Sequence, residues 1–212
     1  MIDDAAHKIH VINVDLNPED HARAEIYALL SNLFYEPASK KLLSVIATGL
    51  GICNDAHDTE FCRAWRALQQ AAAQTSAEAV REEFDTAFIG TGRQPVMLYG
   101  SFYVAGFLHE KPLALLRDDL TTMGLSRRGD RHESEDHVSA VCDVMRFLIA
   151  GDADTPPAAL DSQREFFRRH LAPWSAQLGT AIISANQTDF YKHVAHFMRE
   201  FLAVENAAFD MT

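Results

Sequence analysis

Hydrophobic residues along this chain recur at the three- and four-residue spacing of amphipathic helices. The clearest such stretch begins at Val138, and Gly151 has the residue type that commonly ends a helix. No stretch alternates apolar and polar residues as a half-buried strand would, and the dipeptides typical of tight hairpins are absent. The pattern predicts an all-α protein, a single-domain helical bundle of about nine or ten helices.

Residues with helix-start and helix-stop chemistry divide the pattern into elements. Asn17 followed by Pro18 is typical of an N-cap and a first helical position, and Pro37 closes that helix. Residues 75–78, Thr-Ser-Ala-Glu, have the pattern of a capping box. Because the first residues carry little pattern, we expect a loose N-terminal arm over residues 1–15 and one helical domain over residues 16–212.

Two polar segments interrupt the helical pattern. Residues 90–95 form a Gly, Thr and Pro loop that leads into an aromatic stretch, Tyr99 to Tyr103. The second segment, residues 124–134, is polar and highly charged. Its composition predicts a hinge near residues 124–133, between an N-terminal and a C-terminal helical half.

The balance of charges limits the class of partner. The 212 residues carry 30 Asp and Glu against 19 Lys and Arg, a formal net charge of −11. Proteins that bind nucleic acid depend on neutralising phosphates with basic residues, so we expect no nucleic-acid partner. The acidity suits a cationic partner, and it suits solubility alone equally well.

The cysteines and the apolar stretches indicate a cellular location. The three cysteines form no Cys-x-x-Cys pair, which favours reduced thiols in the cytoplasm. The N-terminus lacks the basic and apolar regions of an export signal. The longest uncharged stretch, residues 94–108, is shorter than the about 20 residues that span a bilayer. We therefore expect a soluble cytoplasmic protein without stable membrane insertion.

An acidic corner, Glu133 to His137, precedes the helix that begins near Val138. In a structural interpretation Ser134 caps this helix, and Glu135 and Asp136 complement its dipole. In a functional interpretation the acids and the imidazole form a notch for guanidinium groups, whose planar fork matches carboxylates. The two interpretations are compatible, because one acid can cap the helix while another faces a ligand.

The aromatic stretch also has two interpretations. Tyr99, Phe102 and Tyr103 lie at helical spacing, which is typical of core packing. They could instead line a groove for an apolar segment, with the tyrosine hydroxyls at its wet rim.

Catalytic and metal-binding patterns are largely missing. The chain contains no Glu-x-x-His pair for a di-iron site and no Gly-x-Ser-x-Gly elbow. We therefore expect no cofactor and no enzyme activity. The alternative is a helical metal-dependent hydrolase that uses Glu133, Asp136 and His137 together with His132. A third hypothesis is a helical scaffold that binds another folded protein, with the acidic corner as a solvated face.

Several blocks together resemble the TorD/DmsD/NarJ-type redox-enzyme maturation chaperones. The acidic corner is similar to that family's acidic-Pro-x-Asp-His motif except at Ser134, where the family usually has proline. Gly100 stands where many members carry Glu, which removes one acid from the site. The other matching blocks, in the family's order, are residues 27–37, ending Leu-Phe-Tyr-Glu-Pro; Phe88-Ile89-Gly90; Tyr99-Gly100-Ser101-Phe102-Tyr103; His170-Leu171-Ala172-Pro173-Trp174; and Asp189-Phe190-Tyr191.

This resemblance implies a non-enzymatic chaperone. Its partners would be the leader peptide, commonly of twin-arginine type, and the catalytic subunit of a molybdopterin oxidoreductase, held in the cytoplasm until its molybdenum cofactor is inserted. The protein would be a monomer, or a dimer that exchanges halves about residues 124–131. The resemblance places leader binding at Tyr99, Ser101, Phe102, Tyr103, Glu133, Glu135, Asp136 and His137.

The magnitudes of the expected contacts separate the roles of these residues. An exposed Arg–carboxylate pair contributes about 0.2–1 kcal/mol. Burying one Leu-sized side chain gains about 1.5–3 kcal/mol before ordering costs. We therefore expect apolar contacts to supply most of the affinity and the acids to select and orient the peptide.

Overall fold

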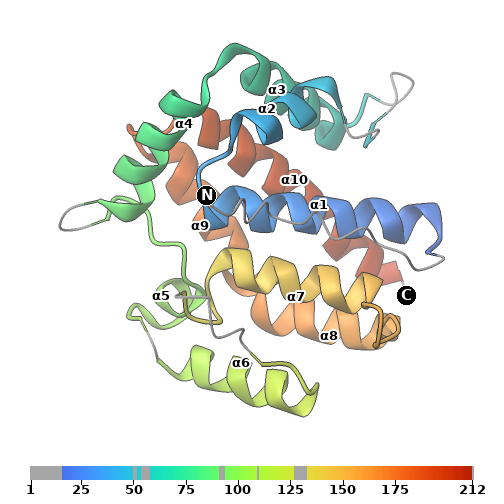
Figure 1. Cartoon of the computed structure of the whole chain (residues 1–212). Coiled ribbons are helices and arrows are strands. Elements are labelled where there is room, and N and C mark those ends of the chain that lie inside the picture. The colour runs from blue at the N-terminus through green and yellow to red at the C-terminus, as the bar shows by residue number, and fades with distance from the viewer. Residues whose placement is uncertain are drawn as a thin grey trace, which may run out of the picture.

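The computed structural model describes residues 16–49, 52–53, 58–90, 94–108, 110–126 and 133–211. Within these ranges the chain forms ten α-helices and one π-helical turn, which confirms the predicted all-α bundle (Figure 1). The predicted arm, residues 1–15, and residues 127–132 of the predicted hinge lie outside the described residues. The elements are α1 (Pro18–Tyr35), α2 (Lys40–Thr48), α3 (Glu60–Gln74), α4 (Ala77–Phe84), η1 (Asp85–Ile89), α5 (Gly100–Ala105), α6 (Lys111–Thr122), α7 (Val138–Ala150), α8 (Leu160–His170), α9 (Ala172–Ser184) and α10 (Phe190–Met211).

Local capping explains where several helices begin. The Asn17 side chain accepts a hydrogen bond from the Asp20 N–H at 2.9 Å, so the predicted start of α1 is confirmed. At residues 75–78 the prediction is wrong by one residue. Ser76 is the N-cap of α4 and accepts from the Ala79 N–H at 3.2 Å, whereas Thr75 ends α3.

The core forms where long helices pack side by side. Helix α1 packs along α7, and α10 packs against α3 and α9, so segments far apart in the sequence lie side by side (Figure 1). Trp65 of α3 is buried and its ring centroid lies 5.0 Å from that of Phe197 of α10. Trp65, which is flanked by two arginines in the sequence, therefore belongs to the core.

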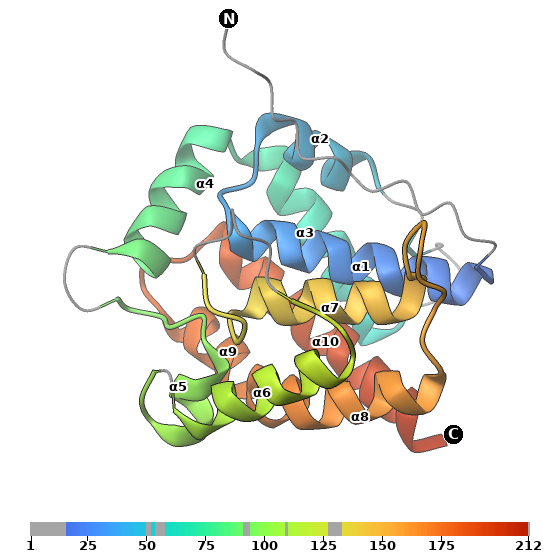
Figure 2. The ribbon, with the colours of Figure 1, turned by 60° about the horizontal axis from the view of Figure 1, so that its bottom comes forward.

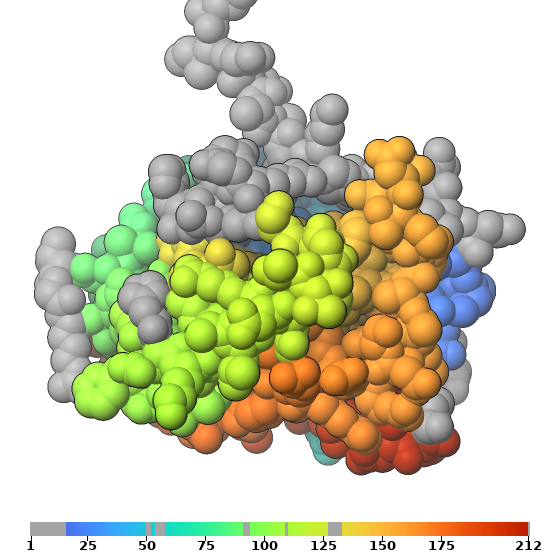
Figure 3. All heavy atoms as spheres, turned by 90° about the horizontal axis from the view of Figure 1, so that it is seen from below, coloured from blue at the N-terminus to red at the C-terminus, as the bar shows by residue number. Residues whose placement is uncertain are grey.

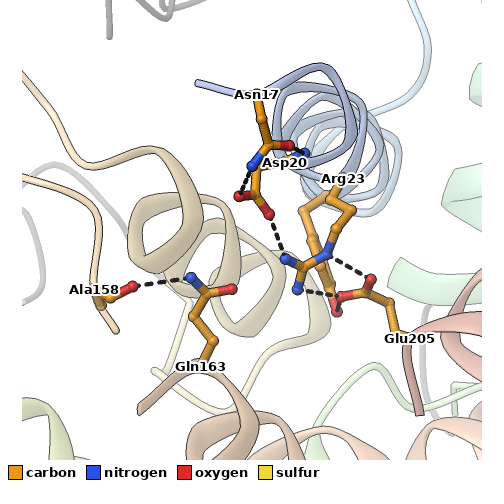
Figure 4. A network of polar contacts seen from close by, with 7 residues as sticks. Asn17, Asp20, Arg23, Ala158, Gln163 and Glu205 are labelled. Atoms are coloured by element: carbon orange, nitrogen blue, oxygen red, sulfur yellow. Dashed lines mark hydrogen bonds and ion pairs between the residues drawn. The ribbon is translucent and has the colours of Figure 1, made fainter. Parts of the chain in front are cut away.

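A buried ion pair joins α1 to α10. The guanidinium of Arg23 donates from Nε to Glu205 Oε1 at 2.7 Å and from Nη2 to Oε2 at 3.0 Å (Figure 4). The Tyr27 hydroxyl donates to the same carboxylate at 3.0 Å, and Asp20 accepts from Arg23 Nη1 at 2.7 Å. These contacts fix the N-terminal half of α1 against the C-terminal half of α10.

The expectation that all three cysteines are reduced is wrong for two of them. Cys53 and Cys62 form a disulfide with their Cα atoms 5.7 Å apart, and Cys142 is free and buried on the apolar face of α7. Cys53 lies beside the first turn of α3. Cys62 is in that helix whereas Cys53 lies outside any helix, and a disulfide between residues nine apart leaves no signal in the spacing rules for cysteine.

Helices α5, α6, α8 and α9 form one end of the molecule, where α5 and α6 lie in front of α9 and beside α8 (Figure 2). Helix α5 contacts both α6 and α9, and α8 contacts α7 and α9. Among the described residues, every helix is either too short or too polar to cross a bilayer.

Candidate functional site

The acidic corner and the aromatic stretch lie against each other. The backbone N–H of Gly100 donates to the carbonyl of Asp136 at 2.9 Å, and the N–H of Val138 donates to the carbonyl of Leu98 at 2.8 Å. These bonds flank a short antiparallel bridge between Tyr99 and His137, which are separated in the sequence by helices α5 and α6. The structure thus brings together the two segments that the sequence singles out.

Asp136 caps helix α5 rather than the helix that follows it. Its Oδ2 accepts from the backbone N–H of Ser101 at 2.9 Å, and its Oδ1 accepts from the hydroxyl of Ser134 at 2.5 Å. The residue is only 4% exposed. A carboxylate at this place satisfies an otherwise unpaired donor in the first turn of α5 and complements the dipole of that helix.

The prediction that Ser134 caps the helix near Val138 is wrong. The N-cap of α7 is His137, whose Nδ1 accepts from the Ser139 N–H at 3.3 Å and lies 2.7 Å from the Ser139 hydroxyl. A turn in which the His137 N–H donates to the Ser134 carbonyl moves the start of the helix three residues along. Burial lowers the pKa of His137 to about 4, against the opposing influence of Glu133 and Asp136.

The two remaining acids of the corner contact side chains of the protein itself. Glu133 accepts a hydrogen bond from the hydroxyl of Tyr99. Glu135 accepts from Nε of Arg117 on α6 at 2.9 Å, and Nη2 of the same arginine lies 2.8 Å from it. The acids of the corner therefore tie α5, α6 and α7 to one another.

The side chains of Tyr99, Phe102 and Tyr103 are half-buried and contact other parts of this end of the molecule. The Tyr103 hydroxyl donates to the Met97 carbonyl at 2.8 Å, and its ring stacks on Trp174 with centroids 6.2 Å apart. Phe102 meets Tyr103 edge to face at 5.2 Å. These rings therefore pack partly against the protein and partly face its surface.

A groove of about 190 Å³ opens on the other face of α5. It lies where α5 and α6 meet the junction of α8 and α9, on the face seen in Figure 3. Val104 and Leu115 on its rim are 52% and 54% exposed, and Phe107 and Leu108 nearby in the α5–α6 connection are also exposed. The lining residues are Gly100, Ser101, Val104, Pro112, Leu115, Leu116, Asp136, Arg169, His170, Pro173 and Trp174.

Two of the eight predicted site residues, Ser101 and Asp136, line this groove, and the other six do not. Sequence reasoning missed the apolar rim on α5 and α6 and the wall formed by His170 and Trp174. The sequence did contain a sign of that wall, because His170-Leu-Ala-Pro-Trp is one of the blocks that resemble the family, although no role was assigned to it. Within the described ranges no group of His, Cys, Asp and Glu is arranged to hold a metal ion, and His132 of the hydrolase alternative lies outside them.

Close packing explains why position 100 is glycine in this chain. A Cβ atom at Gly100 would lie 2.8 Å from Cε2 and Nε1 of the Trp174 indole. That indole is itself held, because Nε1 donates to the His170 carbonyl at 2.6 Å. The absence of a side chain at Gly100 therefore lets α5 lie directly on Trp174, which forms part of the groove.

We expect Gly100→Ala to lower the free energy of unfolding by about 1–3 kcal/mol, because the buried indole cannot move away from an added methyl group. An unobstructed Gly-to-Ala change inside a helix would instead stabilise by about 0.5–1 kcal/mol. Gly179→Ala in α9 is the matched control, since its Cβ would lie 2.6 Å from Cγ and Cδ of Arg199, an exposed side chain that can move, and at ordinary contact distance, 3.7 Å, from Met198 Cε. Urea unfolding of both variants measures the difference, and equal effects would contradict the proposed clash.

The fold and the groove define an all-helical protein with an open apolar surface where α5 and α6 meet the junction of α8 and α9. Residues 54–179 match the family described as nitrate reductase delta subunit, and the chain belongs to that family. The family resemblance inferred from the sequence blocks is thereby confirmed.

Individual relatives cover nearly the whole chain. The chaperone protein TorD of Aliivibrio salmonicida is 23% identical, over 90% of this chain and 96% of its own length. TorD from Vibrio cholerae strain O395 is also 23% identical, over 89% and 92%. A crystal structure from Archaeoglobus fulgidus, assigned as a redox enzyme maturation protein, has the same fold with a TM-score of 0.58 and 19% identity, over 90% of this chain and 96% of that one.

Proposed function

We propose that this protein is a cytoplasmic chaperone that binds the leader peptide of a molybdenum-cofactor oxidoreductase and holds its catalytic subunit for cofactor insertion. Family membership and the relatives named as chaperones support a maturation role without catalysis. The observation that carries the peptide-binding part is the groove, whose rim exposes Val104 and Leu115 to water.

The energetics favour the groove as the main source of affinity. Exposed apolar side chains gain about 1.5–3 kcal/mol each when a partner covers them, before the peptide's ordering cost is subtracted. Micromolar binding requires about 8 kcal/mol. A helical apolar segment that covers Val104, Leu115 and the exposed Phe107 and Leu108 next to the groove can supply a large share of that free energy.

The structure changes the roles that we propose for the acidic corner and the aromatic stretch. Asp136 and His137 cap α5 and α7, and Glu133 and Glu135 hold Tyr99 and Arg117. We propose that these residues position the groove and that the peptide contacts the opposite face of α5. From the predicted set only Ser101 and Asp136 line the groove, and both are buried, so the leader would contact mainly the exposed rim at Val104 and Leu115.

We expect Leu115→Asp to weaken binding of a synthetic leader-type peptide at least about tenfold, because an apolar contact is lost and a charge is placed on the rim. The peptide carries two adjacent arginines followed by an apolar helical stretch, and titration calorimetry measures its affinity. Val204→Asp on α10 is the matched control, since Val204 is 53% exposed and lies outside the groove. Equal affinities of the two variants, or no binding by the unmodified protein, would contradict the proposed site.

A further inference from the structure

Asp119, a carboxylate that none of the sequence motifs includes, lies behind two lining residues of the groove, His170 and Arg169. Asp119 lies on α6, one helical turn after Leu115 and Leu116. Its Oδ2 accepts from Nε2 of His170 at 2.6 Å and lies 3.1 Å from Nη1 of Arg169. His170 and Arg169 both line the groove, so the carboxylate stands at its polar end.

The negative charge of Asp119 is balanced by one partly exposed cation, Arg169. Burial lowers the pKa of His170, although Asp119 opposes this, which disfavours the charged imidazolium. His170 therefore contributes mainly a hydrogen bond to the carboxylate. The positive charge facing Asp119 comes from Arg169, whose side chain is 46% exposed, while that of Asp119 is 25% exposed. Arg169 also lies 3.4 Å from Glu165, one turn earlier on α8. Arg169 therefore has a second carboxylate to pair with if it leaves Asp119.

The acids of the acidic corner are arranged differently. Asp136 is buried and caps α5, and Glu135 is held by two nitrogens of Arg117. Displacing these partners would expose an unpaired helix terminus or break the tie between α6 and the corner. An arginine of a bound peptide could replace Arg169 at Asp119. His170 would keep its hydrogen bond to Asp119, and Arg169 would keep its contact with Glu165.

We propose that Asp119 receives an arginine side chain of a docked apolar peptide, and that Arg169 occupies this position while the groove is empty. The inference rests on the proposed function and names the residue that selects the cation. Residues four apart on a helix are about 5–6 Å apart at Cβ, so a peptide whose apolar side chains cover Leu115 places a neighbouring arginine within reach of Asp119. The planar guanidinium fork fits a carboxylate better than an ammonium group does.

Titration calorimetry with two synthetic peptides tests the proposal. Both peptides carry the same apolar helical stretch, preceded by Arg-Arg in one and by Gln-Gln in the other. We expect Asp119→Asn to weaken the Arg-Arg peptide about fivefold and to leave the Gln-Gln peptide unchanged. Arg169→Gln removes the competing guanidinium, so we expect it to strengthen the Arg-Arg peptide about threefold.

Two further variants control for general charge and for folding. Asp118→Asn makes the same change of net charge at an exposed position next to Asp119, and we expect it to bind both peptides as the unmodified protein does. Asp119→Glu restores the carboxylate, so it should recover most of the Arg-Arg affinity. Urea unfolding of each variant confirms that the fold is retained.

The outcomes separate this inference from the proposed function. If Asp119→Asn behaves as Asp118→Asn does while Leu115→Asp still weakens binding at least about tenfold, the inference is overturned and the proposed function stands. If the unmodified protein binds neither peptide, both are overturned. A loss of Arg-Arg affinity in Asp119→Asn, with recovery in Asp119→Glu, supports both.

Discussion

Glu205→Ala is expected to lower the free energy of unfolding by about 3–5 kcal/mol, because it leaves the charge of Arg23 largely buried and without its main partner. The side chains of Arg23 and Glu205 are 12% and 3% exposed, and two hydrogen bonds join them (Figure 4). The buried hydroxyl of Tyr27 loses its acceptor in the same variant. Chemical unfolding at constant pH measures the change.

A second variant separates the ion pair from simple loss of packing. The Arg23→Met/Glu205→Leu double variant leaves no buried unpaired charge, so we expect most of the lost stability to return. Asp20 loses Arg23 in this variant, but it is partly exposed and still accepts a hydrogen bond from Asn17. Asp143→Ala provides a surface comparison, because the Asp143–Arg146 pair lies within one helix and Asp143 is well exposed. Its effect should be small. A double variant as unstable as Glu205→Ala alone would contradict the buried-charge explanation.

Acidification is expected to destabilise the protein through His137. Burial gives this residue a pKa of about 4 in the folded state, below the value of 6.5 for an unburied histidine. Between these two values the unfolded chain binds a proton at His137 that the folded chain does not, so stability falls as the pH falls. The loss should reach about 2 kcal/mol at pH 5 and about 3 kcal/mol below pH 4.

His137→Asn isolates this contribution. Asparagine is an effective N-cap, so it can accept the hydrogen bond from the Ser139 N–H that His137 accepts at the start of α7. It does not titrate, and every other ionisable group is unchanged. Unfolding in urea at pH 7 and at pH 5 should show a steeper loss for the unmodified protein than for the variant. Parallel losses would mean that His137 does not control the acid response.

Much of the scaffold follows from rules that act between neighbours in the chain. The N-cap Asn17 and the end of α7 at Gly151 could be predicted, because helix capping and helical periodicity depend on residues three or four positions apart. The same rules misplaced the start of α7 by choosing Ser134. They could not show that the Ser134 hydroxyl pairs with Asp136, which turns its carboxylate toward α5.

Gly100 shows the same limit at the site. From the sequence, Gly100 was interpreted as the loss of an acid that many family members carry. The structure shows instead that α5 and α9 leave no space for a side chain at this position, because Gly100 packs against Trp174. Asp119 belongs to no sequence motif, and only the packing of α6 against the end of α8 shows that it contacts His170 beside the groove.

The order of the apolar positions and of the short motifs was enough to establish an all-helical chain and its family, because periodicity and local chemistry are properties of nearby residues. Which face of α5 stays open, which acids are already paired and which glycine must lack a side chain depended on how distant helices pack. Ser101 and Asp136 are 35 positions apart, and Asp119 and His170 are 51 apart. Contacts over such separations are set by the packing of the whole core, which no local pattern encodes.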